Sequence, residues 1–200
     1  MGFSELTGNL FGSDSDSDEE QKTELKYDTF SRKNGEELVM ALVKKHHSLW
    51  GEYIYNAARV VAEWIDQGKH PAFDCKGKRV LELGAGAGLP GLMAGLCGAS
   101  LVCLTDYGTE FDRGLLEAME KNILDFRAKY PLELAGTDLC AAPYIWGNAV
   151  DRLLESSFLE SRKDSEDEPH GGASSTRFDI VIMADCIFNR SEVSECFPKG

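Results

Sequence analysis

The feature that most constrains this chain is a short apolar run that ends in a cluster of glycines. Val80, Leu81 and Leu83 come directly before the glycine-rich segment 84–91, and an apolar run continues over residues 89–97. A short apolar run that stops at glycines and is followed by a longer one is typical of a strand, a tight turn and a helix. The sequence therefore predicts the first crossover of a nucleotide-binding α/β sheet.

The glycine turn is predicted to bind a ligand, because glycine permits positive φ and lets bare backbone approach another molecule. Gly86, Gly88 and Gly91 also fit the dinucleotide pattern G-x-G-x-x-G, so the glycine spacing alone does not identify the ligand. Glu82 favours a cationic ligand, because a carboxylate at the end of the strand repels a pyrophosphate and attracts an ammonium or sulfonium group. S-adenosylmethionine carries both of these cations and no phosphate.

A second acidic residue follows the next predicted strand. Residues 100–105 form an apolar run that ends at Asp106. At that position a carboxylate can accept hydrogen bonds from both hydroxyls of a ribose. A lone aspartate after a strand is usually a helix cap. Asp106 indicates a ligand site because it follows Glu82 and the glycine turn in this order and at this spacing. Together these features predict a site for S-adenosylmethionine.

Length and charge limit the possible organisation and partners. Two hundred residues are enough for one sizeable core, so we expect one domain, residues 25–200, behind a disordered acidic tail, residues 1–24. The chain carries 34 acidic and 21 basic residues, a net charge of -13. This balance argues against binding to a nucleic-acid backbone and fits a basic protein partner better.

Cysteine and histidine patterns predict neither a disulfide framework nor a metal site. The six cysteines contain no C-x-x-C pair and several lie in apolar runs, which is typical of reduced, buried thiols in an intracellular protein. His46 and His47 have no second pair of candidate ligands nearby. No signal peptide and no membrane-spanning stretch are recognisable, so we expect a cytoplasmic protein without a membrane partner.

The rest of the chain predicts further elements of the same fold. Asn34 and Gly35 separate two short runs and predict a β-hairpin before the sheet. Residues 52–67 and 111–130 carry apolar residues at helical spacing. Four sheet strands can be counted, at residues 79–83, 101–105, 132–136 and 179–184.

Two tryptophans lie where they could border a ligand. Trp50 stands beside Gly51 just before the first predicted helix, so its ring could face a cavity. Trp146 belongs to an aromatic cluster at residues 143–148, past a strand end, where open α/β sheets bind ligands. Its ring is as well suited to closing the edge of the core as to lying against an adenine.

Five motifs occur in a fixed order, at residues 48–51, 82–86, 105–107, 144–148 and 184–189. Together they resemble the seven-β-strand methyltransferases of the lysine methyltransferase group. The likeness is greatest to a branch once called nicotinamide N-methyltransferase-like, whose members methylate the N-terminus and lysines of translation elongation factor 1-alpha. The resemblance implies a Rossmann-like class I methyltransferase sheet with helices on both faces and an N-terminal β-hairpin.

The resemblance also implies which residues serve the reaction. Asp185 and Phe188 fit the acid-x-x-aromatic signature of the substrate side, where an acid attracts the acceptor amine and a ring accommodates the methylated product. Methyl transfer is an in-line displacement that requires alignment and no nucleophilic side chain, so no catalytic residue is assigned. The residues implied to contact S-adenosylmethionine are Trp50, Gly84, Ala85, Gly86, Asp106, Trp146 and Ala184.

The chain departs from the family pattern in two ways. Asn189 is followed by residues 190–193 of unlike sequence, where branch members tend to carry His-Ser-Glu-His. The family sheet also has three further strands, so the last strands are expected to be missing and the strand at 179–184 to form an exposed apolar edge. Three alternatives stay open: methylation of a small amine such as nicotinamide, a non-catalytic remnant that binds a cofactor or partner, and, more distantly, a dinucleotide oxidoreductase.

Overall fold

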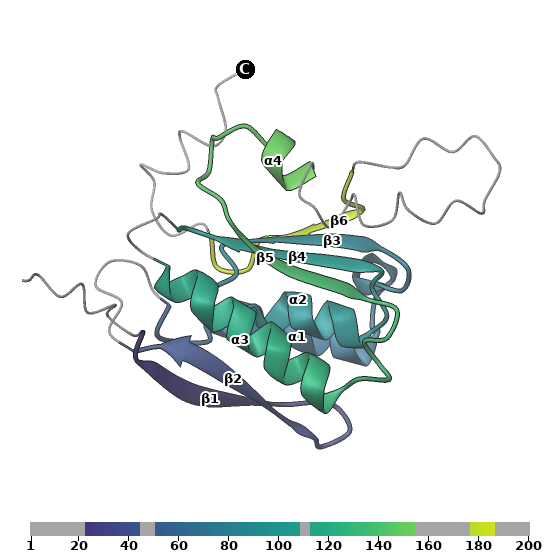
Figure 1. Ribbon diagram of the computed structural model, residues 1–200. Helices are drawn as coiled ribbons and strands as arrows, with labels where there is room; N and C mark the ends of the chain where they lie inside the picture. The colour runs from purple at the N-terminus through teal and green to yellow at the C-terminus, as the bar shows by residue number, and fades with distance from the viewer. Residues whose placement is uncertain (1–22, 45–50, 109–112, 155–176, 187–200) are drawn as a thin grey trace, which may run out of the picture.

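The computed structural model describes residues 23–44, 51–108, 113–154 and 177–186. A parallel four-stranded sheet lies at its centre (Figure 1), with the order β5-β4-β3-β6. Every neighbouring pair in this sheet runs parallel, which confirms the predicted α/β class. The strands are β3 (Arg79–Leu83), β4 (Leu101–Asp106), β5 (Asp138–Pro143) and β6 (Ile180–Ile182).

Helices cover both faces of the sheet to very different extents. Figure 1 shows α1 (Asn56–Gln67), α2 (Leu89–Leu96) and α3 (Gly114–Lys129) on one face of the sheet and the short helix α4 (Asp151–Leu154) on the other. The prediction of helices on both faces is confirmed, although α4 has only four residues and is the one helix on its face in the described part of the chain.

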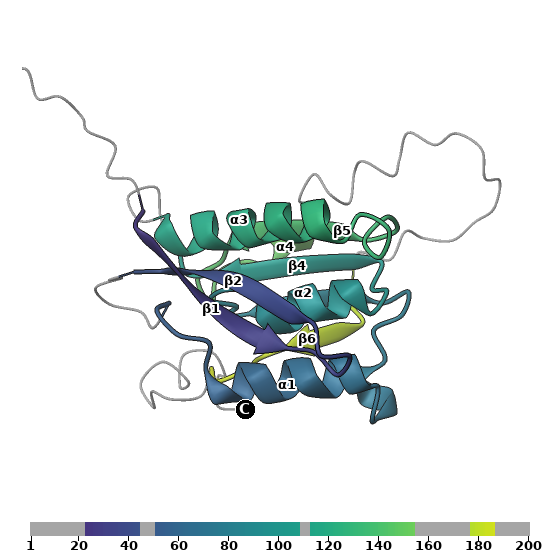
Figure 2. The same ribbon diagram turned by 90° about the horizontal axis from the view of Figure 1, so that it is seen from below.

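The predicted hairpin precedes the sheet and lies below the helices. Its strands, β1 (Leu25–Ser31) and β2 (Glu37–Val43), pair antiparallel around the Asn34-Gly35 turn. Figure 2 shows the hairpin from below, crossing the helices between α1 and α3. Leu38 and Met40 of β2 are fully buried, so the hairpin closes the side of the core that faces away from the sheet.

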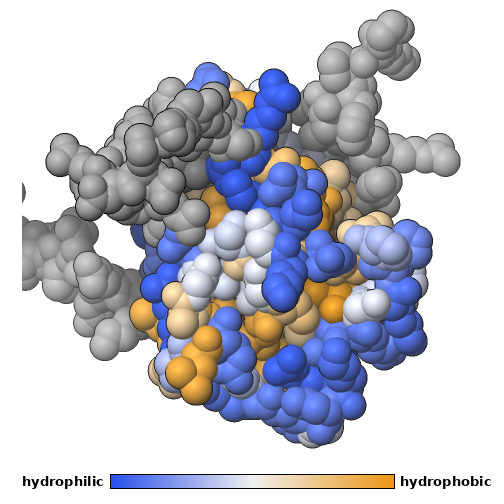
Figure 3. All heavy atoms as spheres, turned by 90° about the vertical axis from the view of Figure 1, so that its right-hand side faces the viewer, coloured by the Kyte–Doolittle hydropathy of each residue, from blue (hydrophilic) through white to orange (hydrophobic). Residues whose placement is uncertain are grey.

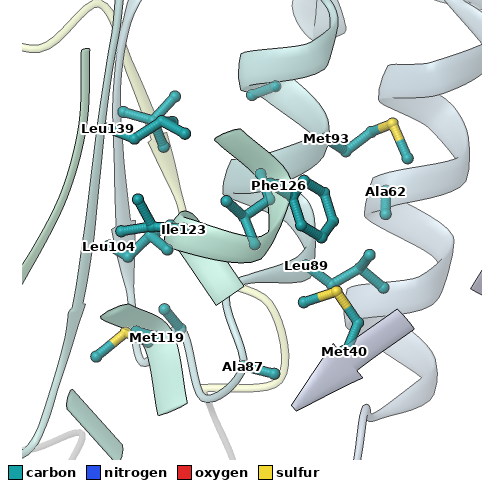
Figure 4. Packing of buried hydrophobic residues seen from close by; sticks show 14 of the residues in the cluster. Met40, Ala62, Ala87, Leu89, Met93, Leu104, Met119, Ile123, Phe126 and Leu139 are labelled. Atoms are coloured by element: carbon teal, nitrogen blue, oxygen red, sulfur yellow. The ribbon is translucent and has the colours of Figure 1, made fainter. Parts of the chain in front are cut away.

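The main hydrophobic core lies between the sheet, the three helices and the hairpin (Figure 4). Burial of each large apolar side chain contributes about 1.5–3 kcal/mol relative to leaving it in water. The second helix is buried along most of its length, which explains why its sequence is apolar on all sides. Buried members of this core that Figure 4 labels include Met40, Ala62, Leu89, Met93, Leu104, Met119, Ile123, Phe126 and Leu139.

Asn122, fully buried on α3, joins three parts of the fold. Its Oδ1 accepts a hydrogen bond from the N–H of Ala41 at 2.7 Å, and its Nδ2 donates to the carbonyl of the same residue at 2.9 Å. Nδ2 also donates to the carbonyl of Ala87, in the glycine turn after β3, at 2.9 Å. The amide therefore pairs with the edge of β2 as a neighbouring strand would, and it links the hairpin to the turn.

One predicted strand is wrong. Residues 132–136, expected to form the third sheet strand, form turns, and β5 begins only at Asp138. Leu134 is buried while Leu132 is 86% exposed, and the N–H of Leu134 bonds to the carbonyl of Tyr130, so this segment extends the end of α3. The true strand contains two alanines and no β-branched or aromatic residue, so its pairing with β4 rather than its own β propensity makes it a strand.

The strand β6 lies at the edge of the described sheet, as expected from the resemblance. Of the described strands, β3 alone pairs with it, and Val181 is 53% exposed. Figure 3 shows the side of the molecule at which the sheet strands begin, where hydrophilic residues surround smaller apolar patches. Within the described ranges, no helix is long and apolar enough to cross a membrane, and no group of acidic, histidine and cysteine side chains is arranged to hold a metal.

We predict that Asn122→Ala lowers the free energy of unfolding by about 2–4 kcal/mol, because it leaves buried backbone groups of β2 and the glycine turn without partners. Urea denaturation followed by circular dichroism measures this change. Asn148→Ala, at an exposed position, is the matched control and should change stability by less than about 0.5 kcal/mol. Equal, small losses in both variants would contradict the linking role of Asn122.

Candidate functional site

A cavity of about 580 Å³ lies at the carboxyl end of the sheet. Four of its walls are the segments that follow β3, β4, β5 and β6, and the segment before α1 forms another. Because the strands are parallel, their carboxyl ends and the segments that begin there lie at one edge of the sheet, where open α/β sheets bind ligands. The volume falls within the range of small-molecule sites.

The glycine turn forms the floor of the cavity with backbone rather than side chains. Gly84 and Gly86 have φ of 63° and 55°, in the left-handed region that other residues rarely adopt. A Cβ at Gly84 would lie 2.7 Å from Sγ of Cys186, so only glycine fits there without a shift. A Cβ at Gly86 would meet no atom within 4 Å, which shows that this position opens into free space.

Asp106, at the end of β4, holds the turn in place and lines the cavity. Its Oδ2 accepts a hydrogen bond from the N–H of Gly86 at 2.6 Å, and its Oδ1 accepts one from the N–H of Tyr107 at 2.6 Å. A carboxylate has about four lone-pair positions, so it can accept hydrogen bonds from several groups at once.

Glu82 lines the same cavity but is almost completely buried, with 1% of its surface exposed. Its Oε2 accepts a hydrogen bond from the N–H of Gly91 at 2.8 Å, in the first turn of α2. Burial raises the pKa of this carboxyl to about 8; the nearby charge of Asp106 adds to the rise and the bond from Gly91 opposes it. The interpretation of Glu82 as a full negative charge at neutral pH is therefore corrected: without a bound cation the carboxyl is largely protonated.

Seven of the nine residues that the family resemblance assigns to the site line this cavity, and the structure does not describe the other two. Trp50 and Phe188 lie outside the described residues. The ring of Trp146 lies above the glycine turn, with Cζ2 3.6 Å from the position of a Cβ on Gly84. The seven lining residues are Gly84, Ala85, Gly86, Asp106, Trp146, Ala184 and Asp185.

The segment after β6 is bound tightly to the end of β3. Sγ of Cys186 donates a hydrogen bond to the carbonyl of Leu83 at 3.1 Å, and burial raises the pKa of this thiol to about 12, so it stays protonated. Asp185 has a φ of 62°, the one positive value outside glycine in the described part of the chain. Such a conformation costs about 1–2 kcal/mol, and it places an exposed acidic residue at the cavity.

Sequence reasoning missed the aromatic residues on the other side of the cavity. Tyr53 and Tyr55 precede α1 and line the cavity. They lie in an irregular segment without periodicity, so no pattern of helix or strand drew attention to them. Their closeness in sequence to Trp50 was the one available signal.

Comparisons with known proteins identify the family of this chain. Residues 35–160 match the lysine methyltransferase family. The chain is 33% identical over 162 residues to the protein N-terminal and lysine N-methyltransferase efm7 of Schizosaccharomyces pombe, covering 81% of this chain and 54% of that protein. It is 36% identical over 170 residues to the enzyme of the same name from Candida albicans, covering 83% of this chain and 58% of that protein.

The chain therefore belongs to the lysine methyltransferase family. It spans little more than half the length of these two curated relatives. Among solved structures, a likeness is found to the protein SMU.776 in its complex with SAH. That likeness has a TM-score of 0.39 and 16% identity, over 68% of this chain and 29% of the other.

We predict that the buried carboxyl of Glu82 makes folding stability fall with rising pH. The unfolded chain loses this proton near the ordinary pKa of 4.5, whereas the folded chain keeps it up to about pH 8. The stability from this group is therefore complete below pH 4.5 and is lost between pH 4.5 and 8, by at most about 1.4 kcal/mol per pH unit.

Glu82→Gln is the matched variant, because an amide keeps an acceptor for Gly91 and cannot ionise. Urea denaturation at several pH values should show a steeper loss of stability for the unaltered chain than for the variant between pH 5 and 8. Parallel pH profiles would show that the carboxyl titrates normally in the folded chain.

Proposed function

We propose that this chain is the cofactor-binding part of an S-adenosylmethionine-dependent protein N-methyltransferase. The cavity at the carboxyl end of the sheet is the observation that carries the proposal, because backbone, acidic and aromatic groups converge there in a member of the lysine methyltransferase family. The glycine turn supplies bare backbone, and Asp106 and Trp146 supply an acceptor and a ring.

The residues present fit S-adenosylmethionine by their chemistry. The carboxylate of Asp106 would accept hydrogen bonds from the ribose hydroxyls, and the ring of Trp146 would lie against the adenine. Gly86 faces open space in the cavity wall, where a ligand can approach the backbone. Glu82 would lose its proton when a cation is bound nearby, because an adjacent positive charge stabilises the carboxylate. When bound, the cofactor supplies a methyl group activated by its positively charged sulfur.

The remaining task of the protein is to orient an amine. Asp185 stands at the cavity and would attract a protonated amine before it loses its proton and reacts. Displacement at a methyl group requires alignment of the two reactants more than any chemical participation by the protein. Cys186 is not a suitable nucleophile, because burial raises the pKa of its thiol to about 12.

For the substrate, we propose the N-terminal amine or a lysine, or both, of translation elongation factor 1-alpha, methylated in the cytoplasm. Two observations support a protein substrate: the relatives are named protein N-terminal and lysine N-methyltransferases, and the net charge of -13 favours a basic partner over a nucleic acid. The alternatives are a small amine such as nicotinamide, and a non-catalytic remnant that binds the cofactor or a partner.

Transfer of a tritiated methyl group tests this function. We predict incorporation into elongation factor 1-alpha that an excess of nicotinamide does not reduce. Competition by nicotinamide would favour the small-amine substrate. A folded chain that binds S-adenosylmethionine in a calorimeter but transfers no methyl group would be the non-catalytic remnant, and the enzyme proposal would be wrong for this polypeptide.

We predict that Gly86→Leu weakens binding of S-adenosylmethionine at least tenfold in isothermal titration calorimetry, because the new side chain enters the cavity. Gly77→Leu is the matched control: Gly77 also has a positive φ, 68°, with nothing within 4 Å of a Cβ, but it does not line the cavity. Both variants carry a similar backbone strain, so a loss of affinity in Gly86→Leu alone shows that the new side chain blocks the cofactor site. Equal loss in both would indicate general destabilisation instead.

A further inference from the structure

We propose that the rim of the cavity carries a second subsite for a protonated amine, formed by Tyr53 and Glu52, and that Lys26 of the same chain occupies it. The subsite would take a lysine of a protein substrate other than the acceptor of the methyl group. The inference rests on the proposed function, because it assigns a further part of the substrate to the same cavity.

The geometry of the subsite is that of an ammonium site. Nζ of Lys26 lies 4.3 Å from the centroid of the Tyr53 ring and 3.6 Å from Oε2 of Glu52. An aromatic face attracts an ammonium through its quadrupole, and a carboxylate beside it adds a charge pair. Lys26 lies on β1 and the two partners lie just before α1, so the contact connects the hairpin to the rim.

The subsite is continuous with the inner part of the cavity. Tyr53 and Tyr55 both line the cavity, and their rings meet edge to face with centroids 6.4 Å apart at 74°. Asp185 also lines the cavity. Burial raises the pKa of Tyr55, and the negative charge of Asp185 adds to this effect. The cavity lining therefore includes Asp185, Tyr55 and Tyr53, and the last of these belongs to the subsite.

Another amine can easily displace Lys26 from this subsite. The side chains of Lys26 and Glu52 are each about one third exposed, at 33% and 32%, and Tyr53 is 62% exposed. An exposed pair of this kind contributes only about 0–1 kcal/mol to folding, so the lysine can leave without loss of the fold.

Two other cations lie over aromatic rings in the described part of the chain, and neither is at the cavity. Lys129 lies over Tyr130 and Arg79 over Phe178, and neither of these rings lines the cavity. The contact at Tyr53 is therefore distinguished by its place at the rim. An incoming amine has to displace Lys26 there, which makes this lysine a built-in competitor of basic substrates.

Peptide binding to the full chain, saturated with S-adenosylhomocysteine, tests the subsite. The probes are two fluorescein-labelled peptides that differ at one position: the first carries two lysines, and the second carries one lysine and a glutamine. Their dissociation constants are measured by fluorescence anisotropy at low ionic strength. Circular dichroism of every variant confirms that it is folded.

We expect Lys26→Met to bind the two-lysine peptide about two- to fivefold more tightly, with no change for the glutamine peptide. Tyr53→Leu should remove the preference for the two-lysine peptide, and in that background Lys26→Met should bring no gain. Lys121→Met is the matched control, because Lys121 is similarly exposed, at 39%, and pairs with Asp125 on α3, outside the cavity. The control should leave both dissociation constants unchanged.

The proposed subsite is refuted if Lys26→Met changes neither dissociation constant, strengthens the binding of both peptides equally, or keeps its gain in affinity in the Tyr53→Leu background. It is also overturned if neither the unaltered chain nor Lys26→Met prefers the two-lysine peptide. Methyl transfer is measured separately. Lysine-dependent binding without transfer would refute the enzyme proposal and retain the subsite, and transfer without any effect of Lys26 would refute the subsite alone.

Discussion

The site depends on one arrangement: two acidic side chains from neighbouring strands hold the glycine turn between them. Glu82 on β3 binds the N–H of Gly91, and Asp106 on β4 binds the N–H of Gly86. One bond fixes the start of α2 and the other fixes the middle of the turn. Because β3 and β4 pair in parallel register, both acids reach the same edge of the sheet, and the turn is shaped before any ligand arrives.

The N-terminal hairpin belongs to this arrangement although it is not part of the sheet. Asn122 pairs with Ala41 of the hairpin and with Ala87 of the turn, so the position of one affects the position of the other. On the opposite strand of the hairpin, Lys26 reaches the rim of the cavity at Tyr53. The hairpin thus supports the floor of the cavity through one residue and contacts its mouth through another.

The sequence predicted those parts of the fold that local patterns determine. Asn34 and Gly35 gave the hairpin, and the glycines after Leu83 gave the turn and the edge of the sheet at which the cavity lies. The prediction from sequence was wrong where the pairing of neighbouring strands decides the structure. The apolar residues at 132–136 are used to end α3, and a strand with weak propensity is recruited by its neighbour β4.

For the candidate site, too, the sequence predicted what strand order determines and missed what tertiary packing determines. The order of Glu82, the glycines and Asp106 was enough to place both acids at one cavity, because strand ends meet there by topology. The protonation of Glu82 could not be predicted, since its burial depends on how α2 packs over β3. The tyrosines before α1 were missed because an irregular segment carries no periodic signal, and only the tertiary structure brings it across from the sheet.

A crystal structure of the chain with S-adenosylhomocysteine would test the central claim most directly. We predict the ribose hydroxyls within hydrogen-bond distance of the Asp106 carboxylate, the adenine against the ring of Trp146, and the glycine turn in the conformation described above. A ligand bound elsewhere, or a nucleoside that contacts neither Asp106 nor the turn, would contradict the assignment of this cavity.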